Sequence, residues 1–317
     1  MIAPRDPAEP AVPANSRPRS GHVWANGLLV PSGTPLLEAS DRAFQVGDGV
    51  FETVRVCEGR VLELALHVAR LVGSARALEI PLRDDLESIL RRAIAELLAA
   101  DELNAPGLEV SVRVTVSRGP VEGRNLLPPR DVLPTIVVQA WPVSPPSAEL
   151  LSRGLHLAIS RVRRDPHSPL ASVKTTSRAE FVYARLEARR AAADDALFLT
   201  VDGYLAEATS ASLFLVRRGA ELLTPALGCG ILVGTTREWL LGWAPTAGLA
   251  VYEGWLLPAH LFAAGEAFLA SSVAGVLPVT RVDGRIIGNG LPGPWTQRAR
   301  DAREAYACSP TQAAPAG

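Results

Sequence analysis

The sequence predicts a mixed α/β protein with two domains. Its 317 residues are enough for two domains with a substantial core. Strand-like and helix-like patterns alternate along the chain, and no internal repeat is visible. The segment WPVSPPSAEL holds three prolines. It predicts a linker over 141–149 between an N-terminal α/β domain at 21–140 and a C-terminal α/β domain at 150–306.

The first predicted domain combines strands with two helices. Alternating apolar residues, or β-branched and aromatic residues beside NG and EG turns, mark the strands GHVWANGLLV, GVFETVRV, EVSVRVTVS and PTIVVQAW. The segment HVARLVGSARALEI has apolar residues at helical spacing instead. A second helix is predicted over 84–100.

The second predicted domain repeats this mixture. Strands are predicted at LHLAIS, ALFLT, SLFLV and GEAFLASS, and helices at TREWLLGWA and PWTQRARDAREAYA. A longer helix is predicted over 178–193. Because Ser177 and Glu180 match the S-x-x-E capping box, this helix is expected to begin just after Lys174.

The composition excludes several classes of protein. The formal net charge is −1, so no overall field draws the chain to nucleic acid or to an anionic membrane. The start lacks the apolar core of a signal peptide, and no apolar stretch is long enough to span a bilayer. We therefore expect a cytoplasmic protein. The Pro-rich start, 1–20, and the end, 307–317, are predicted to be disordered tails.

The cysteines and histidines show no metal-binding or disulfide pattern. Cys57, Cys229 and Cys308 are far apart in the sequence and form no CxxC pair, which fits a reducing compartment. The five histidines are equally scattered. No metal site is predicted.

Lys174 stands out because it is the only lysine among the 32 Lys and Arg residues. Arginine serves wherever only a positive charge is needed, since it stays charged and binds carboxylates through two parallel hydrogen bonds. Only an amine can lose its proton near neutral pH and attack a carbonyl to form a Schiff base. A stray surface lysine is the competing explanation. The position of Lys174 among small hydroxyl residues at a helix start favours a catalytic role over that of a surface residue.

A lysine that holds an aldehyde cofactor suggests pyridoxal 5'-phosphate, which makes further demands on the protein. Its phosphate needs a helix start and a cation, and its ring nitrogen needs a partner of defined charge. GILVGTTREW places Thr235 and Thr236 at a helix start, where free N–H groups favour a phosphate. An ordinary threonine N-cap gives the same pattern. The glycine spacing does not match a dinucleotide-binding loop.

Other candidate residues follow the same reasoning, each with a simpler alternative. Glu207 follows an apolar strand and could pair with the ring nitrogen, or it could face solvent in a hairpin. Arg70 could supply the cation for the phosphate, or could be an ordinary solvated residue of a helix. Ser271 and Ser272 follow a strand and offer small hydroxyl groups, although alone they are typical of a turn.

Taken in order, these segments resemble the class IV aminotransferase family, the fold-type IV enzymes that use pyridoxal phosphate. The resemblance covers about residues 23–300. It is carried by the segments DRAFQVGDGVFETVRV, HVARLVGSA, VTVSRGPVEGR, SVKTTSRAEFVYARLEARRAAADDALFLTVDGYLAEATSASLFLV, GILVGTTRE and FLASSVAGVLPVTRVDG. It implies a two-domain fold with the cofactor between the domains, and a homodimer with its site near the interface.

The resemblance also implies roles for individual residues. Lys174 corresponds to the Schiff-base lysine, which also moves protons, and Glu207 corresponds to the partner of the ring nitrogen. The phosphate is expected to bind at Arg70, Thr235, Thr236 and Ser272. The chain departs from the family at Ser212, where members commonly carry Asn, which puts local hydrogen bonds near the cofactor in doubt.

Two reactions are open to such a site. The resemblance favours an aminotransferase, in which the amine of Lys174 removes the substrate's α-proton and an amino group passes from an amino acid to a 2-oxo acid. The positive end of the following helix is expected to lower the pKa of that amine. The alternative is a 4-amino-4-deoxychorismate lyase that releases 4-aminobenzoate and pyruvate.

A remote further alternative is a catalytically silent relative that acts as a binding or scaffold protein. The intact pair of Lys174 and Glu207 argues against it. Arg118 or Arg124 could receive a substrate carboxylate, but both are more typical of charged loop residues, so neither is assigned a role. The expected partners are small amino-acid and 2-oxo-acid substrates, or aminodeoxychorismate, with no nucleic acid and no membrane.

Overall fold

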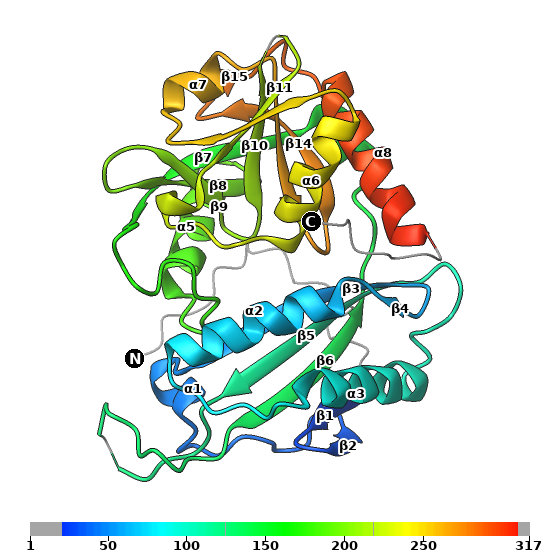
Figure 1. Ribbon diagram of the computed structural model, residues 1–317, viewed down its shortest axis with the longest axis vertical. Coiled ribbons are helices and arrows are strands. Elements are labelled where there is room, and N and C mark those ends of the chain that lie inside the picture. Colours follow the sequence, from blue (N-terminus) through cyan, green and yellow to red (C-terminus); the bar gives the residue numbers. More distant parts are fainter. Residues whose placement is uncertain (1–20, 124, 218, 310–317) are drawn as a thin grey trace, which may run out of the picture.

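The helices and strands lie in two layers, one above the other in Figure 1. The structure is a computed structural model, and it describes residues 21–309 except 124 and 218. The first half of the chain builds the lower layer, and the second half builds the upper layer. The prediction of a mixed α/β fold is confirmed. Of the predicted disordered tails 1–20 and 307–317, residues 1–20 and 310–317 lie outside the described residues.

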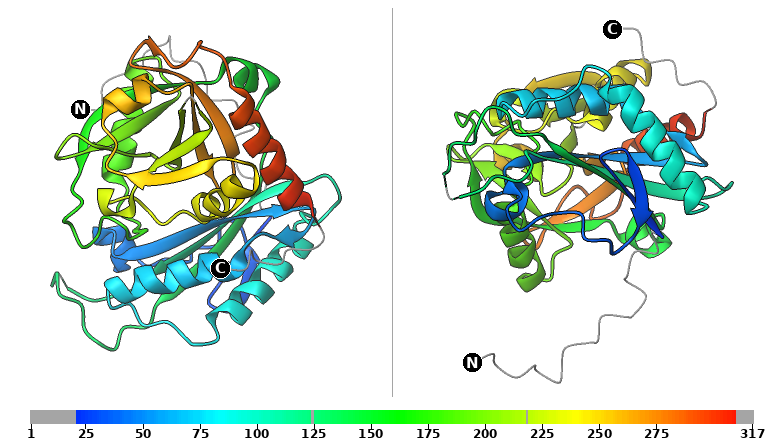
Figure 2. Two further views of the ribbon diagram at one scale, coloured as in Figure 1. Left: turned by 45° about the horizontal axis from the view of Figure 1, so that its top comes forward. Right: turned by 90° about the horizontal axis from the view of Figure 1, so that it is seen from below.

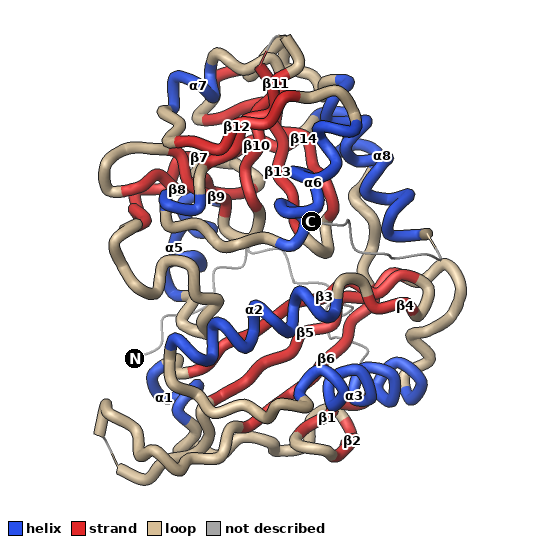
Figure 3. Tube along the Cα trace, in the orientation of Figure 1, coloured by secondary structure: helices blue, strands red, loops and turns tan. Residues whose placement is uncertain are grey.

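The lower layer contains a six-stranded antiparallel sheet in the order β2-β1-β6-β5-β3-β4. Its strands are β1 (His22–Ala25), β2 (Leu28–Pro31), β3 (Gly49–Cys57), β4 (Arg60–Val61), β5 (Glu109–Ser117) and β6 (Thr135–Pro142). Its helices are α1 (Arg42–Val46), α2 (Leu64–Ala77) and α3 (Leu86–Ala100). Helices α2 and α3 cover one face of the sheet (Figure 3).

The alternation along β5 explains which face the helices cover. Val112 and Val114 are fully buried and belong to the core that the sheet shares with α2 and α3. The alternate residues Glu109, Ser111, Arg113 and Thr115 lie on the other face and are half-buried, as the side-chain period of two in a strand requires. Arg113 is one of these residues, and its guanidinium lies 3.9 Å from the centre of the Phe51 ring on β3. Helices α2 and α3 do not cover this second face of the sheet, so its side chains can contribute to a site.

The upper layer contains a nine-stranded sheet in the order β12-β11-β10-β13-β14-β7-β8-β9, with β15 paired to β14. Its strands are β7 (Leu155–Arg164), β8 (Asp195–Thr200), β9 (Leu205–Ala208), β10 (Ser212–Arg217), β11 (Glu221–Pro225), β12 (Ala250–Gly254), β13 (Glu266–Ser271), β14 (Gly275–Val282) and β15 (Arg285–Ile286). Strand β9 pairs with β10 as well as with β8, so the sheet closes on itself. This closure sets Glu207 opposite Ser212.

Helices surround the upper sheet (Figure 1). They are α4 (Ala148–Arg153), α5 (Ala179–Arg190), α6 (Thr235–Thr246), α7 (Pro258–Phe262) and α8 (Pro294–Cys308), with a 3-10 turn at Leu227–Cys229. Within the described part of the chain, no helix combines the length and apolar character needed to cross a membrane.

Two boundaries differ from the prediction. Helix α4 begins at Ala148, inside the predicted linker 141–149, because the Ser147 hydroxyl accepts a hydrogen bond from the Leu150 N–H and so caps the helix. The closing helix α8 runs to Cys308, into the segment that was predicted to be a disordered tail.

The predicted capping box at Ser177 and Glu180 is wrong. Helix α5 begins at Ala179, and its N-cap, Arg178, makes no side-chain capping hydrogen bond. The Ser177 hydroxyl instead donates to the carbonyl oxygen of Gly47 in the lower layer, at 3.1 Å. The S-x-x-E pattern is present in the sequence. The Ser177 hydroxyl does not cap α5, because it is hydrogen-bonded to the lower layer instead.

Ion pairs, one of them buried, connect α8 of the upper layer to the lower layer. Arg303 donates two hydrogen bonds to Glu63, at 2.6 and 3.0 Å, and both side chains are almost fully buried. Arg55 on β3 bridges Glu109 and Glu304. Figure 2 shows α8 running from the upper sheet down to the edge of the lower one. The helix therefore helps to fix how the two layers face each other.

We expect Arg303→Met to destabilise the protein by about 3–5 kcal/mol, because it leaves the buried Glu63 carboxylate without its partner. Replacing both residues, in Arg303→Met/Glu63→Met, should recover much of this loss. Urea denaturation followed by circular dichroism measures both. Arg300→Met, on the same helix, is the control and should change stability by less than about 0.5 kcal/mol. A double variant as unstable as the single one contradicts the prediction.

Candidate active site

The segment around Lys174 joins the two layers. In sequence it lies between β7 and α5 of the upper layer, but its backbone pairs with β3 of the lower layer. The Phe51 N–H donates to the Lys174 carbonyl oxygen at 3.0 Å, and Val50 and Thr175 form an antiparallel bridge. The Lys174 N–H donates to the Ser74 hydroxyl on α2 at 3.3 Å. These contacts fix the lysine backbone between the layers.

The amine of Lys174 has a pKa lowered to about 8. Burial is the largest cause, because removing an ammonium group from water disfavours its charged form. Glu52 and Glu207 oppose this shift, while Arg70 and Arg178 add to it. A lowered pKa for this amine was predicted from the sequence, with the positive end of the following helix as its cause. The main cause is burial instead.

Glu207 is a buried carboxylate on β9 with few partners. The Leu232 N–H donates to Oε2 at 3.2 Å, and Nη2 of Arg164 lies 3.7 Å from Oε1. Burial raises the pKa of Glu207, although Arg164, Leu232 and Lys174 counteract it. Arg164 is its nearest cationic partner among the described residues, and 3.7 Å is long for a charge-assisted hydrogen bond. The Glu207 carboxylate can therefore form a shorter ion pair with another cation.

Residues that were predicted to bind the phosphate come together at the N-terminus of α6. Helix α6 begins at Thr235, and both Thr235 and Thr236 are buried. The first N–H groups of a helix have no acceptor within the helix, and they carry its positive end. The Thr235 hydroxyl lies 3.0 Å from the Ser272 hydroxyl, which follows β13. Three of the four predicted phosphate residues therefore meet at one helix start.

Arg70, the fourth, reaches the same cavity but is already paired. Its guanidinium donates to both oxygens of Glu52, each at 2.7 Å, and His67 lies 2.8 Å from Glu52 as well. Burial opposes ionisation of Glu52, but the hydrogen bonds from Arg70 and His67 outweigh it and lower its pKa to about 2. Arg70 also donates to the Val233 carbonyl just before α6, at 2.6 Å. Sequence reasoning missed Glu52 and His67.

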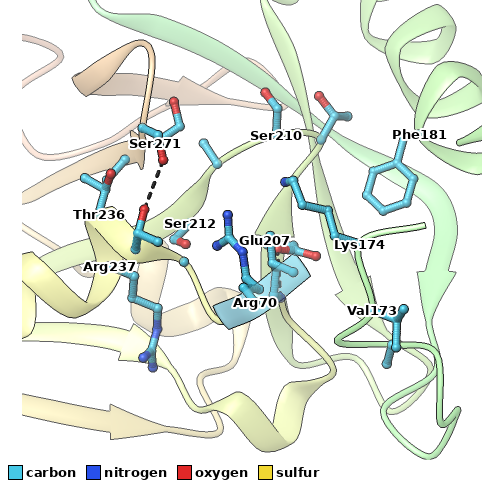
Figure 4. A pocket seen from close by; sticks show the side chains of 18 of the residues that line it. Arg70, Val173, Lys174, Phe181, Glu207, Ser210, Ser212, Thr236, Arg237 and Ser271 are labelled. Atoms are coloured by element: carbon cyan, nitrogen blue, oxygen red, sulfur yellow. Dashed lines mark hydrogen bonds between the residues drawn. The ribbon is translucent and has the colours of Figure 1, made fainter. Parts of the chain in front are cut away.

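All the predicted site residues line one cavity of about 600 Å³, part of which is open to solvent. Figure 4 shows Thr236 and Ser271 on one side and Lys174 and Phe181 on the other, with Glu207 between them. The cavity thus has a helix start at one end, a buried carboxylate in the middle and an amine towards the other end. These groups can bind an anion, hold a proton and accept a proton.

Three further lining residues, Arg164, Arg178 and Phe181, were not predicted as site residues. Arg178 is four residues after Lys174, and this spacing is the signal that could have identified it. Arg164 ends β7, and only the fold brings it beside Glu207. Ser212, the departure from the family pattern, is buried and also lines the cavity.

Arg118 does not reach this cavity. It is buried and binds both oxygens of Asp48, at 2.7 and 3.1 Å, as well as two backbone carbonyls of the lower layer. These contacts make it a structural residue. Arg124, the other arginine considered for a substrate carboxylate, lies outside the described residues.

Comparison with known proteins agrees with this geometry. The family model for class IV aminotransferases matches residues 49–282. A putative branched-chain-amino-acid aminotransferase of Methanocaldococcus jannaschii is 30% identical over 88% of this chain and 94% of its own length.

Solved structures of similar proteins share the fold. A branched-chain amino acid aminotransferase from T.th., solved with pyridoxamine 5'-phosphate, has a TM-score of 0.83 and 28% identity, over 91% of this chain and 94% of its own. A putative 4-amino-4-deoxychorismate lyase from Legionella pneumophila has a TM-score of 0.75 and 28% identity, over 84% of this chain and 94% of its own. The chain belongs to the class IV aminotransferase family.

Proposed function

We propose that this protein transfers an amino group from an amino acid to a 2-oxo acid, using pyridoxal 5'-phosphate held on Lys174. The observation that carries the proposal is the environment of the chain's only lysine. Its amine is buried, has a pKa near 8 and shares one cavity with a buried carboxylate and a helix start. The similar aminotransferase from T.th. has been solved with pyridoxamine 5'-phosphate.

The residues present fit this cofactor. Glu207 has only a distant cation, so a protonated ring nitrogen would complete its ion pair. Thr235, Thr236 and Ser272 offer N–H and hydroxyl groups to a phosphate at the positive end of α6. Arg70 adds positive charge beside them. We assign the phosphate to these four residues and the ring nitrogen to Glu207.

Lys174 and Glu207 then have different roles in the proposed reaction. When bound, pyridoxal phosphate supplies an aldehyde that captures the substrate's amine and a ring that takes up electrons. Glu207 keeps a proton on the ring nitrogen. Lys174 accepts the proton that leaves the substrate's α-carbon, which requires its neutral form. A pKa near 8 instead of 10.5 makes that form roughly 300-fold more abundant at pH 7.

The lyase remains the second candidate, because one similar structure is a putative 4-amino-4-deoxychorismate lyase. Both reactions need the same proton transfer by Lys174. They differ in the next step, since an aminotransferase returns a proton and releases a 2-oxo acid, whereas the lyase eliminates a substituent. The contacts around Lys174 and Glu207 serve both, while more of the similar proteins are aminotransferases.

A substrate panel tests the proposal. We expect the purified holoprotein to form 2-oxo acids from D- or L-amino acids only when 2-oxoglutarate or pyruvate is supplied as acceptor. Chromatography measures both products. Release of 4-aminobenzoate from aminodeoxychorismate without an acceptor shows a lyase instead. A colourless protein that ignores added pyridoxal phosphate contradicts both reactions and favours a silent binding protein.

We expect Lys174→Arg and Lys174→Ala to abolish turnover, because neither a guanidinium nor a methyl group forms an imine under these conditions. Borohydride reduction followed by peptide mass spectrometry should place the cofactor on Lys174 in the wild type. The only competing primary amine is that of the N-terminus, since the chain has no other lysine. Steady-state activity in either variant, or label at another site, refutes the assigned role.

We expect Glu207→Gln to slow removal of the α-proton by roughly 100-fold or more, since a neutral amide holds the ring proton less well. Stopped-flow absorbance of a single turnover with an amino acid measures this step. Glu180→Gln is the control, because Glu180 is exposed on α5, and its rate should equal that of the wild type. If Glu207→Gln also reacts at the wild-type rate, the assignment of Glu207 is wrong.

A further inference from the structure

The cavity holds more positive charge than its carboxylates balance. Its cationic lining residues are Arg70, Arg164, Lys174, Arg178 and Arg237. Three of them form ion pairs, namely Arg70–Glu52, Arg164–Glu207 and Arg237–Glu253. Lys174 is committed to the reaction. Among the described residues, no Asp or Glu forms an ion pair with Arg178.

Arg178 is nevertheless held in a defined position. Its guanidinium stacks on the Phe181 ring, 3.1 Å from the ring centre, and Nη2 donates to the Thr209 carbonyl oxygen at 2.8 Å. The first contact fixes the plane of the guanidinium, and the second fixes its rotation within that plane. Its other N–H groups have no hydrogen-bond acceptor in the described part of the chain. Arg178 therefore presents unused donors in a fixed geometry.

The location of Arg178 separates it from the phosphate site. It is the N-cap of α5, four residues after Lys174, whereas the phosphate site is the start of α6. The positive end of α5 adds to its charge. Leaving a half-buried cation without a partner is costly, and burial lowers the pKa of Arg178 to about 10. An anion other than the phosphate would complete an ion pair for Arg178 at this end of the cavity.

We propose that Arg178 receives the carboxylate of the amino-acid substrate through two parallel hydrogen bonds. This inference rests on the proposed function and extends it, because it states which substrates the site selects. An amino acid bound there places its α-carbon between Arg178 and the Lys174 amine, which must take its proton. Amines without a carboxylate leave Arg178 unpaired, so the site should discriminate against them.

The role of Arg178 can be tested by measuring equilibrium binding of ligands that do not react. The probes are 4-methylpentanoate, a carboxylate with no amine, and its neutral counterpart 4-methylpentanamide, each titrated into the holoprotein by calorimetry. We expect the wild type to bind the carboxylate more tightly than the amide. Arg178→Met should weaken carboxylate binding about 10- to 100-fold and leave amide binding unchanged, because only the charged hydrogen bonds are lost. Arg190→Met is the matched control on α5 and should bind as the wild type does.

Three outcomes overturn the proposal. Carboxylate binding that is unchanged in Arg178→Met shows that the carboxylate binds elsewhere. An equal loss for the carboxylate and the amide shows that Arg178 only shapes the cavity. A changed visible spectrum of the holoprotein with an unchanged carboxylate preference shows that Arg178 holds the cofactor.

Circular dichroism and absorbance show whether Arg178→Met folds and retains the cofactor. If it does not, a second variant tests the proposal. Arg178→Lys keeps the charge but loses the two-donor fork. Carboxylate binding weakened at least five-fold supports the proposal, and unchanged binding contradicts it. Failure of the proposed function is a separate result: the wild type would form no 2-oxo acid from any amino acid, whatever the carboxylate titration shows.

Discussion

The pairing of the lysine segment with β3 is the constraint on which the site depends. Through the contacts of Lys174 and Thr175 with Phe51 and Val50, the segment before α5 forms an isolated antiparallel bridge to β3 of the lower sheet. The amine is then enclosed between the layers and loses much of its hydration. On an exposed loop it would keep an ordinary pKa and remain protonated at neutral pH. The lowered pKa of this amine is therefore a consequence of how the two layers meet.

Arg70 shows how closely the layers and the site are connected. It stands on α2 of the lower layer, yet it donates to the Val233 carbonyl just before α6 of the upper layer. Glu52, ionised at neutral pH, holds its guanidinium by two hydrogen bonds. The arginine proposed to add charge beside the phosphate therefore also contacts the backbone just before α6, the helix at whose start we propose that the phosphate binds. The ion pair of Arg303 on α8 with Glu63 joins the same two layers beside the cavity, where the Arg303 guanidinium also lies 3.5 Å from the hydroxyl of the lining residue Thr236.

The fold class could be predicted from the sequence, and so could the candidate site residues that the structure brings into one cavity, because both leave local signals. Periodicity marks the long elements, and Lys174 is conspicuous by its rarity. Contacts between distant segments leave no such signal. Ser177 matches a capping box but bonds to Gly47, and the sulfur atoms of Cys57 and Cys308, 251 residues apart, lie 3.7 Å from each other.

The charge of the cavity connects stability with specificity. Neither Lys174 nor Arg178 forms an ion pair with a carboxylate of the described residues, and burial lowers the pKa of both groups. Anionic ligands that bind the folded state alone shift its equilibrium towards folding. A site that has desolvated an arginine for one carboxylate also penalises any molecule lacking that group, because the donors then remain unpaired. On the proposed assignment of Arg178, this excess of positive charge is what allows the cavity to distinguish an amino acid from an amine.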